Sequence, residues 1–234
     1  MDIFTLSGKN NTYLIYRFIY TPVRSNMYVY IYGDNAIIID PHSSEELRTL
    51  LEVNGITKVN ILLTHEHYDH TSGLKFLKDM YPCTLFCQRA CAETIVVERK
   101  NNPALVALVL AEQDKLDEGC RYKEFKLHFE PYSYQADCIF ENTIEWQICD
   151  VLIKGVSTPG HSPCSCFYFL DENIVFSGDT ILKSYETIRR FKSSNELLYK
   201  QKTLPYIRSL SPCLKILPGH GDPFRLEEAE YILK

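Results

Sequence analysis

Histidine and aspartate side chains are concentrated in one short stretch of the sequence, Thr64-His65-Glu66-His67-Tyr68-Asp69-His70. Three imidazoles and a carboxylate in so short a segment match the ligands that zinc and other borderline divalent metals prefer. In an extended segment, residues two apart point to the same side, so His65 and His67 can bind one ion together. Asp69 and His70 follow as the chain turns away, and they can face a second ion. A solvated polar loop is the alternative interpretation, and it is the weaker one.

Three further motifs place a histidine or an aspartate directly after a predicted strand. They are Val156-Ser-Thr-Pro-Gly-His161, Val175-Phe-Ser-Gly-Asp179 and Ile216-Leu-Pro-Gly-His220. In each motif a glycine precedes the polar residue and permits the tight turn that carries its side chain away from the strand end. Because open α/β sheets bind ligands beyond the carboxyl ends of their strands, the four loops together predict one metal centre.

The elements that position these loops are predicted from the periodicity of apolar and aromatic residues. Strands are expected over residues 13–20, 26–32, 36–40, 59–63, 84–87, 144–148, 151–156, 167–170, 174–176 and 214–217. Helices are expected over residues 43–54, 72–80, 89–98, 104–116, 195–210 and 225–233. Strand-rich stretches mixed with helices in both halves of the chain predict an α/β fold of two sheets packed face to face, with helices outside them.

The composition is that of an ordinary globular protein, with 45% hydrophobic and 24% charged residues. A length of 234 residues predicts a single domain over residues 1–234, in which residues 99–137 form a flap or connection over the active site. A net charge of −5 and a pI of about 5.8 argue against a nucleic-acid partner. No stretch is typical of a signal peptide or a membrane span, so no membrane partner is expected. The nine cysteines lack the spacing of a disulfide framework and indicate a reduced, cytoplasmic protein.

With these motifs in this order, the chain resembles metallo-β-lactamase-fold hydrolases, and among them the glyoxalase II-like branch. The resemblance extends from about Asn26 to His220. It implies the metallo-β-lactamase fold, an αββα four-layer sandwich of two mixed β-sheets with outer helices and a metal site along one edge. It also implies a first ion held by His65, His67 and His161. The second ion would be held by Asp69, His70 and His220, and Asp179 would bridge the two.

The resemblance implies two divalent metal ions per chain, with zinc as the leading expectation and iron or manganese as alternatives. Two such ions can share a hydroxide because together they lower the pKa of bound water towards neutrality. The metal-bound hydroxide would attack a carbonyl or phosphoryl centre, while Asp69 orients it and moves its proton. The expected function is therefore a metal-dependent hydrolase that cleaves a small ester, thioester or lactone, and less readily a phosphodiester.

Two other classes of function use or could use the same loops. Persulfide dioxygenases resemble this sequence but bind a single iron through two histidines and one aspartate, here His65, His161 and Asp179. A non-catalytic scaffold is disfavoured because every ligand position is filled. The substrate, the native metal and the oligomeric state are not specified by the sequence.

Several side chains near the motifs have two interpretations. The family's usual Asp-Pro-Gly is Asp40-Pro41-His42 here, and His42 is expected to be an exposed loop histidine rather than a ligand. Arg189 and Arg190 either meet an anionic substrate or form a solvated pair. Cys164 and Cys166 are expected to pack as small hydrophobic side chains rather than to bind metal.

Overall fold

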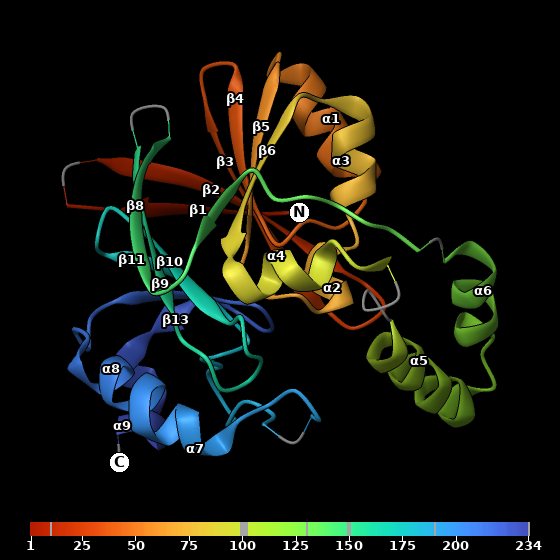
Figure 1. Cartoon of the computed structure of the whole chain (residues 1–234). Helices are drawn as coiled ribbons and strands as arrows, with labels where there is room; N and C mark the ends of the chain where they lie inside the picture. Colours follow the sequence, from red (N-terminus) through yellow and green to blue (C-terminus); the bar gives the residue numbers. More distant parts are fainter. Residues whose placement is uncertain (10, 99–102, 130, 149–150, 190, 234) are drawn as a thin grey trace.

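In the computed structural model, two β-sheets pack face to face and helices cover their outer faces (Figure 1). The structure describes residues 1–9, 11–98, 103–129, 131–148, 151–189 and 191–233. This arrangement confirms the predicted αββα sandwich with two mixed sheets.

The first sheet has seven strands in the order in which they occur along the chain. They are β1 (Asp2–Ser7), β2 (Thr12–Tyr20), β3 (Ser25–Tyr32), β4 (Asn35–Ile39), β5 (Lys58–Leu63), β6 (Cys83–Gln88) and β7 (Cys138–Phe140). Strands β1 to β4 are antiparallel neighbours, whereas β4 to β7 are parallel. The parallel pairing of β4 with β5 brings the segments after both strands to the same edge of the sheet, so Asp40 lies next to Thr64 and the histidine cluster.

The second sheet has six strands in the order β13-β12-β11-β10-β9-β8. They are β8 (Thr143–Ile148), β9 (Val151–Ser157), β10 (Cys166–Leu170), β11 (Ile174–Gly178), β12 (Lys215–Pro218) and β13 (Phe224–Arg225). Strands β11 and β12 are parallel, and β9 runs in the same direction because β10 between β9 and β11 is antiparallel to both. The loops that carry His161, Asp179 and His220 therefore emerge at one edge of this sheet.

Side chains that alternate along the strands fill three separate hydrophobic layers. In β4, Ile37 faces the second sheet, and its neighbour Ile38 faces the helices outside the first sheet. In β10, Tyr168 likewise points into the layer between the sheets, whereas Phe167 packs against the helices outside the second sheet. Near-continuous apolar strands such as β4 and β10 are thus buried on both faces, as strands covered by helices must be.

Helices cover the outer face of each sheet (Figure 1). On the first sheet these are α1 (Glu45–Val53), α3 (Leu74–Met80) and α4 (Arg89–Ile95), with the short α2 (Tyr68–Thr71) inside the histidine cluster. On the second sheet they are α7 (Glu196–Leu198), a π-helical turn (Tyr199–Thr203), α8 (Leu204–Ser209) and α9 (Glu230–Leu233). The predicted helix over 195–210 is therefore present, but its middle turn is π-helical.

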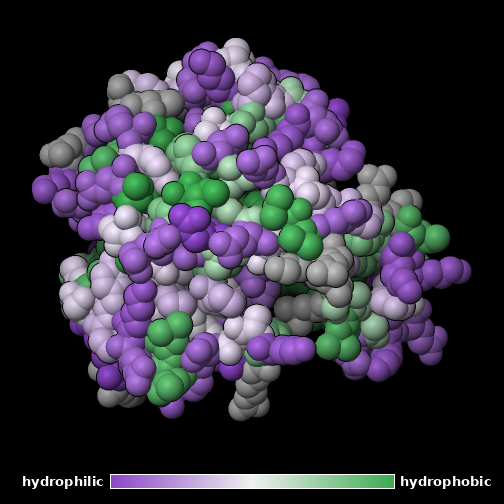
Figure 2. Space-filling model, in the orientation of Figure 1, coloured by the Kyte–Doolittle hydropathy of each residue, from purple (hydrophilic) through white to green (hydrophobic). Residues whose placement is uncertain are grey.

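Two helices stand apart from the sandwich at the right of Figure 1. They are α5 (Ala104–Asp117), which confirms the helix predicted over 104–116, and α6 (Arg121–His128), which lies in a stretch that sequence patterns left unassigned. Figure 2 shows that hydrophobic side chains also reach the surface of this part of the molecule, and the exposed ones include Leu108 and Leu127.

The secondary structure differs from the sequence-based predictions near both ends of the described chain. Strand β1 was not predicted, although it pairs along its whole length with β2. The helix predicted over 225–233 starts too early, because Phe224 and Arg225 pair with β12 and a 3-10 turn (Leu226–Glu228) precedes α9. In both cases pairing with the adjacent strand of the sheet overrides the local pattern.

Candidate metal centre

Three histidines from two loops place their ring nitrogens against one another. His65 and His67 follow β5, and His161 follows β9. Nδ1 of His67 lies 3.0 Å from Nε2 of His65 and 3.1 Å from Nε2 of His161. Burial lowers the pKa of His65 and of His161, and neighbouring imidazoles contribute to the shift. Neutral imidazoles that converge in this way are suited to bind a divalent cation.

A second set of ligand atoms lies beside the first. Oδ2 of Asp69 is 3.3 Å from Nε2 of His70 and 3.3 Å from Nε2 of His220. Burial alone would lower the pKa of His220, but the carboxylates of Asp179 and Asp69 raise it to about 10. The same carboxylates overcome burial at His70 and raise its pKa well above the usual value. In this half of the centre two carboxylates thus lie against two imidazoles, a mixed oxygen and nitrogen donor set that suits a divalent cation.

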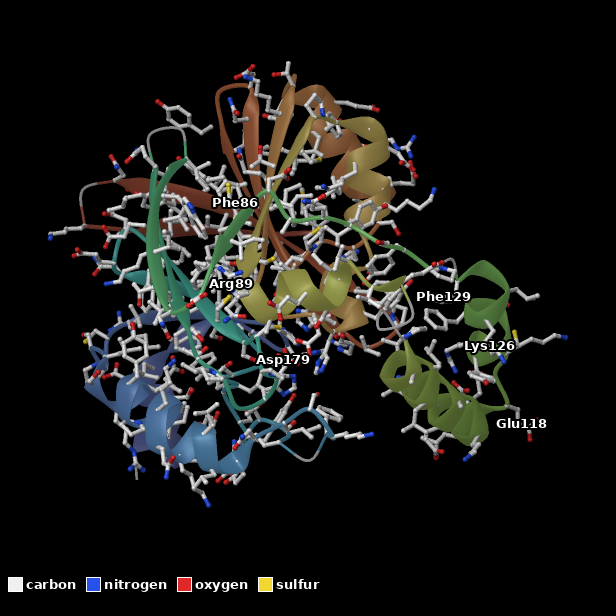
Figure 3. The ribbon with its side chains drawn as sticks, viewed as in Figure 1. Phe86, Arg89, Glu118, Lys126, Phe129 and Asp179 are labelled. Atoms are coloured by element: carbon white, nitrogen blue, oxygen red, sulfur yellow. The ribbon has the colours of Figure 1, made fainter. Side chains whose placement is uncertain are left out.

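Asp179, which follows β11, stands between the two sets. Its Oδ2 lies 3.6 Å from Nε2 of His161 and 3.5 Å from Nε2 of His220, while its Oδ1 lies 3.4 Å from Nε2 of His70. Burial opposes ionisation of Asp179, yet His220 and His70 lower its pKa well below the usual value. Figure 3 shows Asp179 where the loops of the two sheets meet.

The donor set fits two divalent ions. Potential ligand atoms lie within 4.8 Å of one another in the set of His65, His67, His161 and Asp179, and also in the set of Asp69, His70 and His220. Nε2 of His70 and Oδ1 of Asp179 are buried without a well-formed hydrogen bond, a costly state that a cation between them would relieve. The structure therefore brings all seven predicted ligand residues together, and their binding of metal stays a prediction.

Two glycines allow the loops to approach this closely. Gly178 has a φ of +48°, and a Cβ there would collide with the side chain of Thr64. A Cβ at Gly219 would overlap Oδ1 of Asp179 and press on the ring of His70. Both glycines are therefore needed for space, and Gly178 is also needed for its left-handed backbone conformation.

Asp40 contacts the candidate ligand residues from behind, a position that sequence reasoning did not select. Its Oδ1 accepts a hydrogen bond from the backbone N–H of Thr64 (2.7 Å), and its Oδ2 accepts one from the Thr64 hydroxyl (2.6 Å). Oδ2 also lies 2.9 Å from Nδ1 of His70. This contact fixes the ring of His70 so that Nε2 faces Asp69 and Asp179, a common role of carboxylates behind metal-binding histidines. The sequence did contain one indication of this role. Asp40 directly follows β4, which is parallel to β5, so it had to lie at the same edge of the sheet as the histidine cluster.

Glu66 is a second supporting residue that sequence reasoning did not select, although it lies between the predicted ligands His65 and His67. Its Oε2 accepts hydrogen bonds from the hydroxyl of Ser162 (2.7 Å) and from the thiol of Cys164 (2.6 Å). Ser162 directly follows His161, so the carboxylate of Glu66 joins the two loops that supply the three-histidine set. Sequence spacing offered no signal for this contact, since the partners lie 96 and 98 residues away.

The segment after Asp179 supports the other side of His161. Nδ1 of His161 lies 2.8 Å from the carbonyl oxygen of Ile188, and the Thr187 hydroxyl donates to the carbonyl oxygen of Asp179. The ring of Phe191 packs edge-on against His161 and His67, with centroid distances of 5.6 and 5.5 Å. His161 is thereby held with Nε2 towards the centre.

A cavity of about 190 Å³ opens onto Asp69, Asp179, His161 and His220. Its other walls are mainly apolar: Val23, Val106, Val109, Leu182, Tyr185, Thr187, Ile188 and Phe191. Two of these residues, Val106 and Val109, belong to α5. The helix predicted over 104–116 thus forms part of the wall that faces the metal centre.

Two of the ambiguous side chains have structural roles. His42 is only 4% exposed, so the expectation of an exposed loop histidine is wrong. Its ring packs 5.3 Å from that of Tyr20, and its backbone is covered by Gly73 at the start of α3. Arg189 is ion-paired with Glu186 and Glu196 and lies over a tyrosine ring, so it is neither solvated nor free for an anion. Arg190 lies outside the described residues.

The thiols behave as the sequence predicts. Burial raises the pKa of Cys164 to about 11 and that of Cys166 well above its usual value, so both remain protonated. Among the described residues, the groups able to hold a metal contain histidine and aspartate only. Cys166 packs between the sheets, and its thiol points to the carbonyl oxygens of Leu63 and Thr64.

Comparison with known proteins agrees with this fold and site. Residues 20–220 match the Metallo-beta-lactamase superfamily, and the chain belongs to this superfamily, whose members are generally metal-dependent enzymes. A relative described as "Probable metallo-hydrolase YqgX" from Bacillus subtilis is 24% identical over 202 residues, or 86% of each chain. The hydroxyacylglutathione hydrolase of Prochlorococcus marinus is 24% identical over 201 residues, which cover 83% of this chain and 64% of that enzyme.

A solved structure shares the fold. The crystal structure of TTHA1623 in a di-iron-bound form has a TM-score of 0.67 and 21% identity, covering 92% of this chain and 96% of that one. At this identity the likeness supports the αββα fold alone. Within the described part of the chain, no helix combines the length and apolar character needed to cross a membrane.

Proposed function

We propose that this protein is a dinuclear metallohydrolase that cleaves a small ester, thioester or lactone. The observation that carries the proposal is the position of Asp179. One of its carboxylate oxygens faces His161 at 3.6 Å, and the other faces His70 at 3.4 Å. A carboxylate shared by two adjacent ligand sets is the arrangement expected of a two-metal hydrolytic site.

Two divalent ions bound there would supply a hydroxide nucleophile near neutral pH and a Lewis acid for the substrate oxygen. Zinc is the leading choice because imidazole nitrogens dominate the donor set, with iron and manganese as alternatives. Asp69 is proposed to orient the nucleophile and to move its proton. Its carboxylate lines the cavity and lies 3.3 Å from ring nitrogens of both His70 and His220.

The walls of the cavity favour a neutral substrate. Val106, Val109, Ile188 and Phe191 give the space next to Asp179 an apolar lining, and the described residues that line it include neither lysine nor arginine. The apolar lining suits a carbonyl substrate that carries a small uncharged group next to its reacting centre.

A mononuclear-iron oxidoreductase that acts on persulfides is the alternative. It would use His65, His161 and Asp179, whose ring nitrogens and carboxylate also lie close together, at 4.0 and 3.6 Å. It would leave the assembly of Asp69 and His220 without a role, and for this reason we favour the hydrolase.

Metal content and activity together test the proposal. We expect protein purified without added metal to hold two divalent ions per chain, and zinc-loaded protein to hydrolyse members of a panel of thioesters, lactones and phosphodiesters. A single iron per chain, with oxygen consumption on a persulfide and no hydrolysis, would overturn the proposal.

A further inference from the structure

A second hollow, of about 500 Å³, lies beside the cavity at the metal centre. It is bounded by the end of β2 and the turn after it, by Tyr68 of the histidine cluster, and by α5 and α6. We name it the aromatic groove; its lining residues are Tyr20, Thr21, Pro22, Tyr68, Leu110, Gln113, Arg121, Glu124, Phe125 and Phe129. Figure 3 shows Phe129 between α6 and the sandwich, and Glu118 at the far end of the turn that joins α5 to α6.

Aromatic rings form the floor and one wall of the groove. The ring of Tyr68 packs edge-on against Phe125 and Phe129, with centroid distances of 5.6 and 5.5 Å. The hydroxyl of Tyr20 lies in hydrogen-bonding contact with that of Tyr68, and burial is the main reason why the pKa of Tyr68 is raised. These four rings are only partly buried. Partly exposed rings gathered around a hollow are typical of a ligand site.

The groove continues from the metal cavity along the same elements. On α5, Val106 and Val109 line the metal cavity, and Leu110, one turn of helix beyond Val106, lines the groove. In the turn after β2, Pro22 lines the groove and its neighbour Val23 lines the cavity. Neighbouring residues of α5 and of the turn after β2 thus line both the metal cavity and the aromatic groove.

The charged residues of the groove already have partners. Arg121 pairs with Asp114 at 3.2 Å and with Asp117 at 2.5 Å. Glu124 accepts a hydrogen bond from the thiol of Cys120. The remaining lining is aromatic, aliphatic or uncharged polar, so an uncharged ligand suits it best.

We propose that the aromatic groove binds a neutral aromatic or alkyl arm of the substrate whose reacting carbonyl lies next to Asp179. The proposal rests on the hydrolase function and adds the substrate class, an ester or thioester with one large apolar arm. Tyr68, which lies between the predicted ligands His67 and Asp69, would then contact the arm. His67 and Asp69 would bind the metal ions that act on the reacting carbonyl.

Three thioesters with the same reacting group test this inference. They are S-ethyl thioacetate, which is too small to reach the groove, S-(2-naphthyl) thioacetate, and the S-ethyl thioester of 2-naphthoic acid. The two naphthyl compounds carry the ring on opposite sides of the carbonyl, so they reveal which side of the substrate occupies the groove. Each variant is compared with the wild-type protein on the same compound, so that differences in intrinsic reactivity cancel.

The test variant is Phe125→Ala combined with Phe129→Ala in the zinc-loaded protein. We expect kcat/KM for one naphthyl thioester to fall at least about 10-fold, as expected for the loss of hydrophobic contacts, and kcat/KM for S-ethyl thioacetate to change less than about 2-fold. Tyr122→Ala is the matched control, because Tyr122 is an exposed aromatic residue of α6 that does not line the groove. It should change neither value. Equal losses on all three compounds, or no loss, would overturn the proposal.

A second variant guards against a fold defect in α6. Thr21 is exposed and lines the groove from the opposite side, so Thr21→Trp should fill the groove without disturbing α6. We expect it to raise KM for the same naphthyl thioester about 10-fold and to leave S-ethyl thioacetate unaffected. Normal KM values for all compounds would contradict the assignment of the groove.

Calorimetric titration with 2-naphthol separates this inference from the hydrolase proposal. We expect the wild-type protein to bind 2-naphthol and the Phe125→Ala, Phe129→Ala variant to bind it about 10-fold more weakly. If no ester, thioester or lactone is hydrolysed but this difference is found, the hydrolase proposal falls and the groove stands as a site for an apolar ligand. If hydrolysis is found and 2-naphthol does not bind, the groove falls and the hydrolase stands.

Discussion

The strand-end loops and α5 line the same cavity, but the loops are held in a very different way from the α5–α6 pair. His65 and His70 are 1% and 0% exposed, and each has a hydrogen-bond partner behind its ring, Thr64 and Asp40 respectively. The ends of α5 and α6, by contrast, carry exposed apolar residues such as Leu116 and Leu127. Contacts to the sandwich include a long hydrogen bond from Gln113 to the carbonyl oxygen of Pro22 (3.4 Å) and the ring contacts of Tyr68.

This difference separates two tasks. Ligand atoms must stay within a few tenths of an ångström of their positions to bind a cation, and buried strand ends with supporting hydrogen bonds provide that rigidity. A wall that contacts the rest of the substrate needs shape and apolar surface, and a helix pair that carries exposed apolar side chains provides both. We therefore expect substitutions in the loops to change metal binding and substitutions in α5 or α6 to change substrate preference.

The largest effect is expected at the residue common to both ligand sets. Asp179→Asn replaces a carboxylate with a neutral amide, so we expect turnover to fall about 10²–10³-fold and metal occupancy to drop while the fold survives. Turnover, metal content and circular dichroism would be measured. Asp79→Asn, at an exposed residue of α3 that pairs with Lys75, is the control and should behave as wild type. Wild-type turnover with two bound ions would remove Asp179 from the site.

The His220→Ala variant should distinguish the two metal ions, because we expect it to lose only one of them. His220 belongs to the second set and lies 3.3 Å from Asp69, so we expect the loss of about one metal equivalent and a fall in hydrolysis of about 10². His42→Ala is a matched control, because His42 is buried but lies outside the metal-candidate groups. This control should keep both metal equivalents. Retention of both ions in His220→Ala would show that the second set is not a ligand set.

Glu66→Ala should weaken only the first ion. The carboxylate joins the loop of His65 and His67 to that of His161, and removing such support typically lowers metal affinity by about 10-fold or more. Competition with a chelator, together with the absorption spectrum of cobalt-substituted protein, would identify which ion is weakened. Glu93→Ala, an exposed residue of α4, should leave both affinities unchanged. Equal weakening of both ions would argue for a general loss of stability.

The smallest effect on metal binding is expected at the buried thiols. Replacing Cys164 and Cys166 with alanine or serine should leave the metal stoichiometry unchanged and lower the free energy of unfolding by about 1–3 kcal/mol. Urea denaturation and metal analysis would measure both quantities. Loss of one metal equivalent from the folded double variant would indicate that a thiolate binds metal. It would contradict the assignment of these cysteines to packing.

The sequence by itself determined the metal-ligand candidates and most of the fold. His161, Asp179 and His220 each follow a strand and a glycine, and the periodicity of those strands is a local signal. Local patterns of this kind also predicted α5 within a residue of its observed end. Such signals can be read because the side chains that form them are neighbours along the chain.

Only the tertiary structure decided which residues support those ligands and what faces them. Asp40 meets His70 across 30 residues, and Glu66 meets Ser162 across 96. The burial of His42 follows from its contact with α3, and the aromatic groove arises only when α6 is placed opposite β2 and Tyr68. These features depend on contacts between segments far apart in sequence. A single sequence does not encode them as a local pattern, because the packing of the whole chain brings the partners together.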